Sequence, residues 1–273
     1  MTNSLRLMSY NILEGLRPVT PGSGERRLLD RERTEAARCV VGELQPDILV
    51  LNEALFCRQY SGRSINYAQL FGFPYESAAL YDDAWGNAIL SRYPIARSSE
   101  MRIHNRGGLV VTIDTPIGTL AVASYHPHPA RYPPNKAADF ARLITDVRGP
   151  LIVCGDLNGI SPDDVIDRSA MIAGCGRFSA TPEQTVDLFV ESGRQIFATL
   201  RKFGLGDAVP PVGRRYSIPT DLLSIDKSSA MRIDHVLAND GIAIIDGEVY
   251  QSTTSNRASD HHPVSIEFRI NAT

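Results

Sequence analysis

The fold of this chain is most constrained by a series of short apolar runs that recur along its length. Each run is partly β-branched and is bounded by Gly, Pro, Asn or Asp, a pattern typical of strands. The runs cover residues 5–12, 47–51, 88–90, 109–113, 120–124, 151–154, 233–237 and 264–270. Because Thr-Pro-Ile-Gly at 115–118 provides a turn, we expect residues 109–113 and 120–124 to pair as an antiparallel hairpin.

Three segments between these runs have the apolar spacing of amphipathic helices, namely residues 31–44, 136–147 and 195–203. Strands interleaved with helices that cover sheet faces predict an α/β fold, a four-layer α/β sandwich of two packed, mainly antiparallel sheets flanked by helices. A length of 273 residues fits a single domain, 1–273, of this kind. The Pro/Gly-rich segments 17–24 and 209–219 are expected to be loops at the rim of the site.

The composition excludes some classes of function. Hydrophobic residues make up 43% of the chain and charged residues 22%, and no apolar run is long enough to cross a bilayer. The first residues show no basic region followed by an apolar stretch, so we expect no secretory signal and a cytoplasmic location. The net charge of -3 argues against strong nonspecific binding of long nucleic acid. No obligate protein partner is evident.

The four cysteines, Cys39, Cys57, Cys154 and Cys175, form no C-x-x-C pair and no dense framework. Cysteines in apolar segments commonly act as small core residues. We therefore expect reduced, buried thiols.

Polar residues stand at the ends of several apolar runs, where strand tips can converge on one site. Each has an ordinary structural explanation, since Asn11 could cap a turn and Asp156 with Asn158 could form an Asx turn. Glu53 is less easily explained, because a carboxylate that closes a buried strand needs a metal, a partner or water. Taken together, these carboxylates and amides are suited to hold a hard divalent cation.

The histidines near the C-terminus can be sorted by strand periodicity. If residues 233–237 form a strand, His235 packs inside and Asp234 lies on the opposite face, where it could orient another histidine. Only one of His261 and His262 can point into the same site as Asp234, because adjacent strand residues face opposite sides. The spacing alone leaves that choice open.

These motifs, in this order, resemble those of the endonuclease/exonuclease/phosphatase superfamily, which includes DNase-I-like nucleases, exonuclease III, neutral sphingomyelinases and inositol polyphosphate 5-phosphatases. The resemblance covers nearly the whole chain. It is carried by Ser9-Tyr10-Asn11-Ile12, residues 47–53, Gly86-Asn87-Ala88-Ile89-Leu90-Ser91-Arg92, Gly155-Asp156-Leu157-Asn158, Arg232-Ile233-Asp234-His235 and Ser259-Asp260-His261-His262-Pro263-Val264.

The resemblance implies a metal site and a fold of packed sheets. Asn11 and Glu53 would bind Mg²⁺ or Mn²⁺, with Asp260 close to the metal. At Asn52 the family usually has glutamine, so a contact behind the metal site differs in this chain.

The resemblance also implies catalytic roles. Asp156 would position or deprotonate the attacking water, and Asn158 would hold a phosphate oxygen. The family pattern Ser-Asp-His-x-Pro selects His261, aligned by Asp234, to contact the phosphate or assist proton transfer. His126 matches a histidine that touches the scissile phosphate. It is followed by Pro-His-Pro where leucine is commoner, which indicates a distinct wall to the substrate pocket.

Such a set suits metal-assisted hydrolysis, because a divalent ion neutralises phosphate charge and activates water. We expect a phosphomonoesterase or phosphodiesterase that favours a small phosphoester. A DNA or RNA endonuclease or exonuclease is the alternative, and a sphingomyelinase-like role is weaker because no apolar segment indicates membrane docking. Trp85 could stack on a base or simply pack.

Three other readings are disfavoured. A covalent serine mechanism lacks a Gly-x-Ser-x-Gly motif. A zinc hydrolase built on His126 and His128 would need an acid and a histidine where Ala130 and Arg131 stand. A non-catalytic module would be expected to lose such residues as Glu53.

Overall fold

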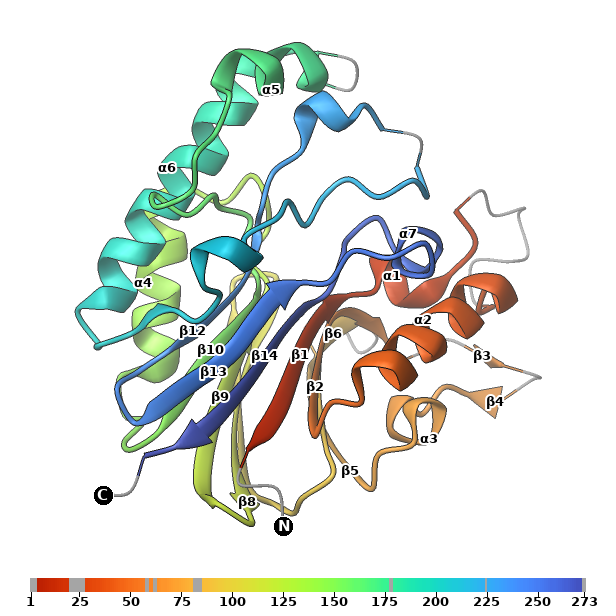
Figure 1. Cartoon of the computed structure of the whole chain (residues 1–273), viewed down its shortest axis with the longest axis vertical. Helices are drawn as coiled ribbons and strands as arrows, with labels where there is room; N and C mark the ends of the chain where they lie inside the picture. The colour runs from red at the N-terminus through yellow and green to blue at the C-terminus, as the bar shows by residue number, and fades with distance from the viewer. Residues whose placement is uncertain are drawn as a thin grey trace.

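The computed structural model describes residues 4–19, 28–56, 59–60, 63–80, 85–176, 179–223 and 225–271. Its centre is a pair of six-stranded sheets packed face to face, with helices on both outer faces (Figure 1). Each sheet contains one parallel pair of strands, β1 with β2 and β9 with β10, among antiparallel neighbours. The predicted four-layer α/β sandwich of mainly antiparallel sheets is confirmed.

The first sheet has the order β13-β14-β1-β2-β6-β5 and the second the order β11-β12-β10-β9-β8-β7. The strands of the first sheet are β1 (Leu5–Asn11), β2 (Ile48–Leu55), β5 (Tyr75–Leu80), β6 (Trp85–Ser91), β13 (Ile242–Val249) and β14 (Val264–Ile270). Those of the second are β7 (Ile95–Ile103), β8 (Arg106–Thr115), β9 (Gly118–Tyr125), β10 (Leu151–Asp156), β11 (Gly206–Asp207) and β12 (Asp234–Ala238). A small separate ribbon pairs β3 (Gln59–Tyr60) with β4 (Arg63–Ser64).

Helices cover the outer faces and connect the strands. They are α1 (Leu13–Leu16), α2 (Arg31–Leu44), α3 (Tyr67–Phe71), α4 (Pro133–Ile144), α5 (Arg168–Cys175), α6 (Pro182–Arg201) and α7 (Ser255–Ala258), with single 3₁₀ turns η1 (Pro211–Gly213) and η2 (Lys227–Ser229). Figure 1 shows α2 and α3 outside the first sheet and α4 and α6 outside the second. The start of β1 and the end of β14 lie at the end of the sheets opposite α1 and α7.

The main core lies between the two sheets. Leu7 and Val50 of the first sheet and Val122 and Ile152 of the second are fully buried within it. Separate apolar clusters fill the spaces under α2 with α3 and under α4 with α6. Each fully buried aliphatic side chain contributes ~1.5–3 kcal/mol relative to its exposed state, so the sandwich holds the strand ends in fixed positions.

Most of the predicted elements are confirmed, with shifted ends. The helix predicted at 31–44 has those bounds, and residues 109–113 and 120–124 form the expected hairpin of β8 and β9. The helix predicted at 136–147 begins at Pro133, because proline is tolerated in the first helical turn, and ends at Ile144. The helix predicted at 195–203 is the last part of a longer helix, α6, which begins at Pro182 and ends at Arg201.

The apolar pattern did not predict strand β7. Strand β7 is an edge strand whose central residues are exposed, so its sequence shows no buried alternation. Of the Pro/Gly-rich segments, 209–219 contains η1, while residues 20–24 of the other lie outside the described part.

The prediction for the cysteines is partly wrong. Cys154 and Cys175 are buried, but Cys39 is exposed because it lies on the solvent side of α2, away from the apolar face. Cys57 lies outside the described residues. Among the helices in the described ranges, none is long and apolar enough to cross a membrane.

Helix α6 crosses the loop after β10 at very close range. A Cβ atom on Gly193 would lie 1.7 Å from the carbonyl oxygen of Ile160. The backbone N–H of Ile160 in turn donates to the carbonyl of Phe189 at 3.0 Å. Glycine at 193 therefore lets α6 rest directly on the loop that follows Asn158.

Replacing Gly193 with alanine tests this contact. We expect Gly193→Ala to lower the free energy of unfolding by ~1–3 kcal/mol or more, because the added methyl group cannot be accommodated without backbone shifts. Gly42→Ala is the matched control, since an alanine Cβ there would meet nothing within 4 Å and alanine favours a helix by up to ~1 kcal/mol. Urea unfolding of both variants provides the comparison. Equal stability of Gly193→Ala and the wild type would contradict the close packing.

Candidate active site

The predicted site residues gather at one end of the two sheets. Asn11 ends β1, Asp156 ends β10 and Asp234 begins β12, while His261 lies just before β14. Adjacent strands from both sheets therefore contribute. All eight candidates, Asn11, Glu53, His126, Asp156, Asn158, Asp234, Asp260 and His261, are linked by hydrogen bonds or short ionic contacts.

A buried amide lies directly beneath the site. Asn52 in β2 is fully buried, and its Nδ2 donates to Asn87 Oδ1 at 2.9 Å and to Ser124 Oγ at 3.2 Å. Its Oδ1 accepts from the backbone N–H of Asp156 at 2.8 Å. Since Ser124 and Asp156 belong to the second sheet, this one side chain joins the sheets and fixes the end of β10.

Glu53 faces the site because β2 is irregular at this point. The pairing of β2 with β6 shifts between Leu51 and Ala54, and Glu53 has a positive φ of 57°. Its Oε2 accepts from the backbone N–H of Glu14 at 2.8 Å. Burial, and then the negative charge of Asp260, raise the pKa of Glu53 above its usual value.

The amide of Asn11 joins the two halves of the site. Its Nδ2 donates to Glu53 Oε1 at 3.2 Å and to Asp156 Oδ2 at 3.1 Å. Its Oδ1 accepts from the backbone N–H of Leu13 at 3.0 Å. The hydroxyl of Ser259 donates to the Asn11 carbonyl at 2.7 Å, which holds the segment containing Asp260 against β1.

Arg33 of α2 also supports this region, although its place in the sequence does not mark it as a site residue. It is 3% exposed and donates to the carbonyls of Ala258 at 3.0 Å, Ile12 at 3.0 Å and Leu13 at 3.2 Å. The available signal was an arginine on the apolar face of a helix. Through these hydrogen bonds it holds the segment after Asn11 next to the segment before Asp260.

Asp156 and Asn158 form a tight turn at the end of β10. The backbone N–H of Asn158 donates to Asp156 Oδ1 at 2.9 Å, and Asn158 has a positive φ of 46°, which asparagine tolerates. Its side-chain Nδ2 donates to the carbonyl of Pro127 at 3.0 Å. Burial, and then the charge of Asp234, raise the pKa of Asp156 to about 7.

Lys136 holds this turn from behind and was also missed as a functional candidate. Its fully buried ammonium group donates to the Asn158 carbonyl at 2.9 Å and to Ser192 Oγ at 3.0 Å. Burial lowers the pKa of Lys136 to about 8, and the charge of Asp156 partly opposes the shift. Helices α4 and α6 are thus connected to the site through one cation.

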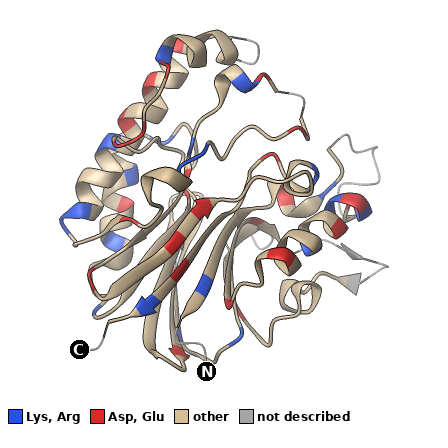
Figure 2. Cartoon of the chain, viewed as in Figure 1, with Lys and Arg blue, Asp and Glu red and all other residues tan. Residues whose placement is uncertain are grey.

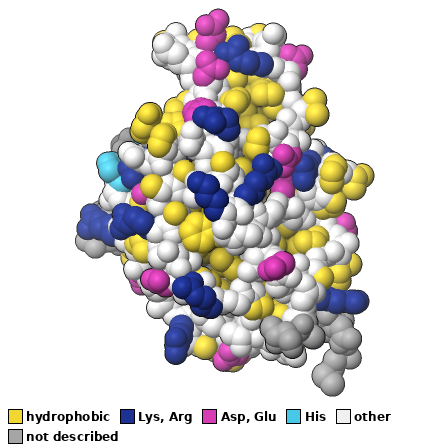
Figure 3. Space-filling view, turned by 90° about the vertical axis from the view of Figure 1, so that its left-hand side faces the viewer, with side chains coloured by type: hydrophobic (Ala, Val, Ile, Leu, Met, Phe, Trp, Pro, Cys, Tyr) yellow, Lys and Arg dark blue, Asp and Glu magenta, His cyan; other side chains and the backbone are white. Residues whose placement is uncertain are grey.

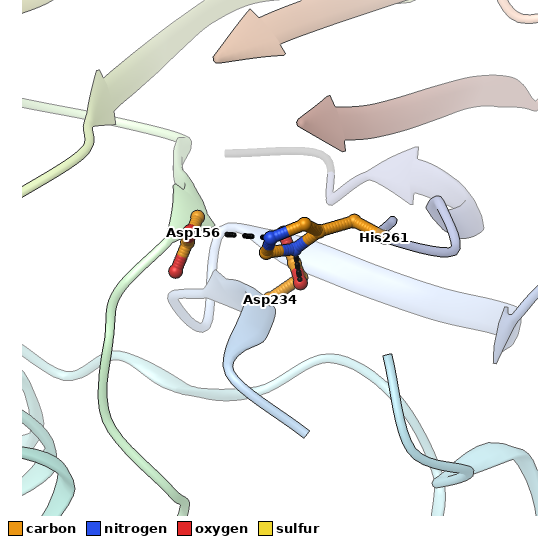
Figure 4. Close-up of side chains that lie close together, drawn as sticks. All are labelled: Asp156, Asp234 and His261. Carbon is orange, nitrogen blue, oxygen red and sulfur yellow. Dashed lines mark hydrogen bonds and ion pairs between the residues drawn. The ribbon is translucent and has the colours of Figure 1, made fainter. Parts of the chain in front are cut away.

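His261 and Asp234 form a dyad that faces Asp156 (Figure 4). His261 Nδ1 donates to Asp234 Oδ2 at 2.7 Å, and its Nε2 lies 3.9 Å from Asp156 Oδ2 and 3.9 Å from Asp260 Oδ1. Burial alone would lower the pKa of His261, but the charges of Asp234 and Asp260 raise it well above the usual value. These two carboxylates therefore favour the protonated form of the ring.

The neighbouring histidines point elsewhere. His262 Nδ1 lies 2.9 Å from Ser255 Oγ, and its ring packs edge-on against Tyr216. His235 Nε2 donates to the Gly159 carbonyl at 2.8 Å. Each of these two histidines is buried, and burial lowers its pKa to about 4. The structure places His261, and not His262, in the site, and His235 is packed as expected.

His126 approaches the site from β9. Its Nε2 lies 3.3 Å from Asp156 Oδ2, and burial, then the charges of Arg106 and His261, lower its pKa to about 3. A neutral ring can donate a hydrogen bond without adding charge. His128 is exposed, and in the described ranges no group of His, Cys, Asp and Glu suited to a metal includes these two histidines. Trp85 is half-buried at the start of β6.

Two groups of side chains could hold a metal ion. Ligand atoms of Asp156, Asp234 and His261 lie within 4.8 Å of one another, but His261 and Asp234 already bind each other. Asp260 is close enough to Glu53 for its negative charge to raise the pKa of Glu53. Hard oxygen donors with unbalanced negative charge are what Mg²⁺ or Mn²⁺ prefers, so the residues present fit such an ion.

Comparisons with known proteins agree with this arrangement. The sequence profile of the Endonuclease/Exonuclease/phosphatase family matches residues 8–261. The chain belongs to this family. It is therefore a phosphoric ester hydrolase, and members of the family generally depend on a divalent metal. No significant match is found among curated proteins.

Solved structures share the fold at low sequence identity. An endonuclease/exonuclease/phosphatase from Beutenbergia cavernae DSM 12333 matches with a TM-score of 0.69 and 22% identity, over 99% of this chain and 72% of that one. A family member from Bacteroides vulgatus has a TM-score of 0.63 and 14% identity, over 99% and 100%. The 3′ phosphatase NExo from Neisseria, bound to a product DNA hairpin, has a TM-score of 0.62 and 19% identity, over 98% and 100%.

The buried amide beneath the site can be tested by replacement. We expect Asn52→Leu to lower the free energy of unfolding by several kcal/mol, because the N–H of Asp156 and two buried side chains lose their partners at ~1–3 kcal/mol each. Asn135→Leu is the control, since Asn135 is exposed on α4. Unfolding by denaturant measures both. A stable Asn52→Leu variant would mean that the sheets are joined by other contacts.

Proposed function

We propose that this chain is an Mg²⁺- or Mn²⁺-dependent phosphoesterase that hydrolyses a phosphomonoester or phosphodiester by attack of activated water. It would act as one domain over residues 1–273, with a small phosphoester as the favoured substrate. The observation that carries the proposal is the position of Asp156. Its Oδ2 lies 3.1 Å from Asn11 Nδ2, 3.3 Å from His126 Nε2 and 3.9 Å from His261 Nε2, where the two sheets meet.

The surroundings of Asp156 support a role as general base. A carboxylate with a pKa of about 7 accepts a proton more readily at neutral pH than an ordinary aspartate, and catalytic groups work best with a pKa near the working pH. It would orient the attacking water and take its proton. Asn11 and Asn158 restrain the two oxygens of this carboxylate, so its direction is set before substrate binds.

The cationic and neutral donors around Asp156 suit the phosphate. His261, kept protonated by Asp234, would donate to a phosphate oxygen and stabilise negative charge that develops in the transition state. Neutral His126 and the amide of Asn158 would add hydrogen bonds. Asn11, Glu53 and Asp260 would hold the metal ion, which supplies charge neutralisation at the phosphate and lowers the pKa of bound water.

The surface charge favours a small substrate. The helices carry both basic and acidic residues (Figure 2). On the face seen in Figure 3 the basic side chains stand in separate groups among apolar and acidic ones. Long nucleic acid is held by an extended set of phosphate contacts. A DNA or RNA nuclease is the second candidate, and the similarity to NExo, which is bound to a DNA hairpin, favours it among the alternatives.

The metal requirement is tested first. Hydrolysis of a chromogenic phosphoester should stop in excess chelator and return with Mg²⁺ or Mn²⁺. Glu53→Ala should stay inactive at any metal concentration, because the ion loses a carboxylate ligand. Glu35→Ala is the control, since Glu35 is an exposed glutamate on α2. Full activity of metal-free protein, or a normal turnover number for Glu53→Ala, would refute this metal site.

The two adjacent histidines give the second test. His261→Ala should lower the turnover number by about 10²–10⁴-fold, as expected for the loss of an acid-base group. His262→Ala should mainly lower stability, because that ring packs against Tyr216 away from the site. Steady-state kinetics and thermal unfolding separate the two effects. The opposite pattern would show that His262 carries the chemistry.

A further inference from the structure

A cavity lies between the β7–β8 turn and the segment that follows β9. It has a volume of about 330 Å³ and is lined by His104, Asn105, His128, Ala130, Arg131 and Tyr132. The catalytic roles proposed above use none of these residues. Tyr132 is exposed and immediately precedes α4, so the positive end of that helix adjoins the cavity.

The cavity is joined to the proposed catalytic residues by a short piece of chain. His128 follows His126 by two residues. Between them, the carbonyl of Pro127 accepts the hydrogen bond from Asn158 Nδ2 at 3.0 Å. A ligand in the cavity would therefore lie next to the segment that positions both His126 and Asn158.

The wall of the cavity carries hydrogen-bond donors. His128 Nδ1 accepts from the backbone N–H of Ala130 at 3.1 Å, so the neutral ring carries its proton on Nε2. His104 Nδ1 donates to Asn105 Oδ1 at 2.9 Å, which leaves the amide nitrogen of Asn105 as a donor. Arg131 binds Asp139 through Nε and Nη2 and keeps Nη1 for another acceptor.

The electrostatic surroundings of His128 are positive. Burial, and then the charges of Arg106, Lys136 and His104, lower the pKa of His128. Each of those three charges acts against a proton on its ring. Asp139, the acid beside the cavity, is already paired with Arg131. Hydrogen-bond donors with positive charge nearby are the features that bind a phosphate group.

We propose that this cavity binds a second phosphate group of the substrate, one that is not hydrolysed. The inference rests on the proposed phosphoesterase function and narrows it, because a substrate with two phosphates would occupy the reacting centre and the cavity together. The second phosphate could belong to a small bisphosphate or to the next nucleotide of a short chain. The chemistry of recognition is the same in both cases.

Binding of pyrophosphate to chelator-treated protein tests the cavity without any need for activity. Pyrophosphate should shift the ring NMR signals of His104 and His128, while the acidic cluster around Asp156 repels it. His128→Ala should weaken binding about tenfold, as for the loss of one hydrogen bond to a charged group. Arg97→Ala, at an exposed arginine on β7, should bind like the wild type. Equal affinity of all three proteins, or shifts confined to His126 and His261, would overturn the proposal.

Steady-state kinetics with matched substrates tests whether the cavity contributes to substrate binding during catalysis. His128→Ala and Asn105→Ala should raise KM for a nucleoside 3′,5′-bisphosphate about tenfold, while kcat and the hydrolysis of p-nitrophenyl phosphate stay unchanged. The same KM effect seen only with a dinucleotide would support the cavity and assign the second phosphate to a nucleic acid chain. An equal loss of kcat on every substrate would show a merely structural role and refute the proposal.

The two proposals fail in different ways. If no phosphoester is hydrolysed with Mg²⁺ or Mn²⁺, the proposed function fails, and the pyrophosphate titration still decides whether the cavity binds phosphate. If simple esters are hydrolysed normally and neither variant affects any bisphosphate or dinucleotide, the function stands and the cavity is not a phosphate site.

Discussion

The site depends on the hydrogen bonds of one buried amide, that of Asn52. A buried polar group without a hydrogen-bond partner would lower the free energy of unfolding by ~1–3 kcal/mol. Each partner of Asn52 is therefore held within hydrogen-bonding distance of its amide. Those partners lie in both sheets: Asn87 in the first, Ser124 and the N–H of Asp156 in the second. Asn87 in turn donates to the Gly107 carbonyl in β8 at 2.6 Å. Apolar packing alone would let two sheets slide, whereas directional bonds fix their register, and with it the position of Asp156 relative to Asn11.

The backbone at the site is held in conformations that the chain would not adopt alone. Glu53 has a positive φ of 57°, where a side chain such as glutamate is disfavoured. It persists because β2 continues on both sides and because Oε2 of Glu53 accepts the N–H of Glu14. Residues held in this way cluster at functional sites, at a cost of order 1–3 kcal/mol each. In this conformation the carboxylate reaches the amide of Asn11 and the backbone N–H of Glu14.

Much of the fold and of the site could be predicted from sequence, and the gaps have physical causes. Helix α2 was predictable because its apolar face alternates cleanly with a charged one, and the polar residues at strand ends were visible because they interrupt apolar runs. Edge strand β7 could not be seen, since its exposed side chains give no periodicity. Arg33 and Lys136 were missed for a different reason. Each is a basic residue on the buried face of its helix. Only the fold shows that each donates hydrogen bonds to backbone carbonyls next to the site.

The charges at the site are balanced only in part by the protein. The site contains four carboxylates, those of Glu53, Asp156, Asp234 and Asp260. The cations that interact with them electrostatically are His261 and, at the loop carbonyls next to the site, Arg33. Because the pKa values of Glu53 and Asp156 are raised, the surroundings stabilise the protonated form of each carboxyl group. A divalent cation would replace those protons, and metal affinity that releases protons must fall as the pH falls. The same excess of negative charge that would attract the ion would repel a free phosphate, so substrate anions would need both the bound cation and the donors of His126, Asn158 and His261 to enter.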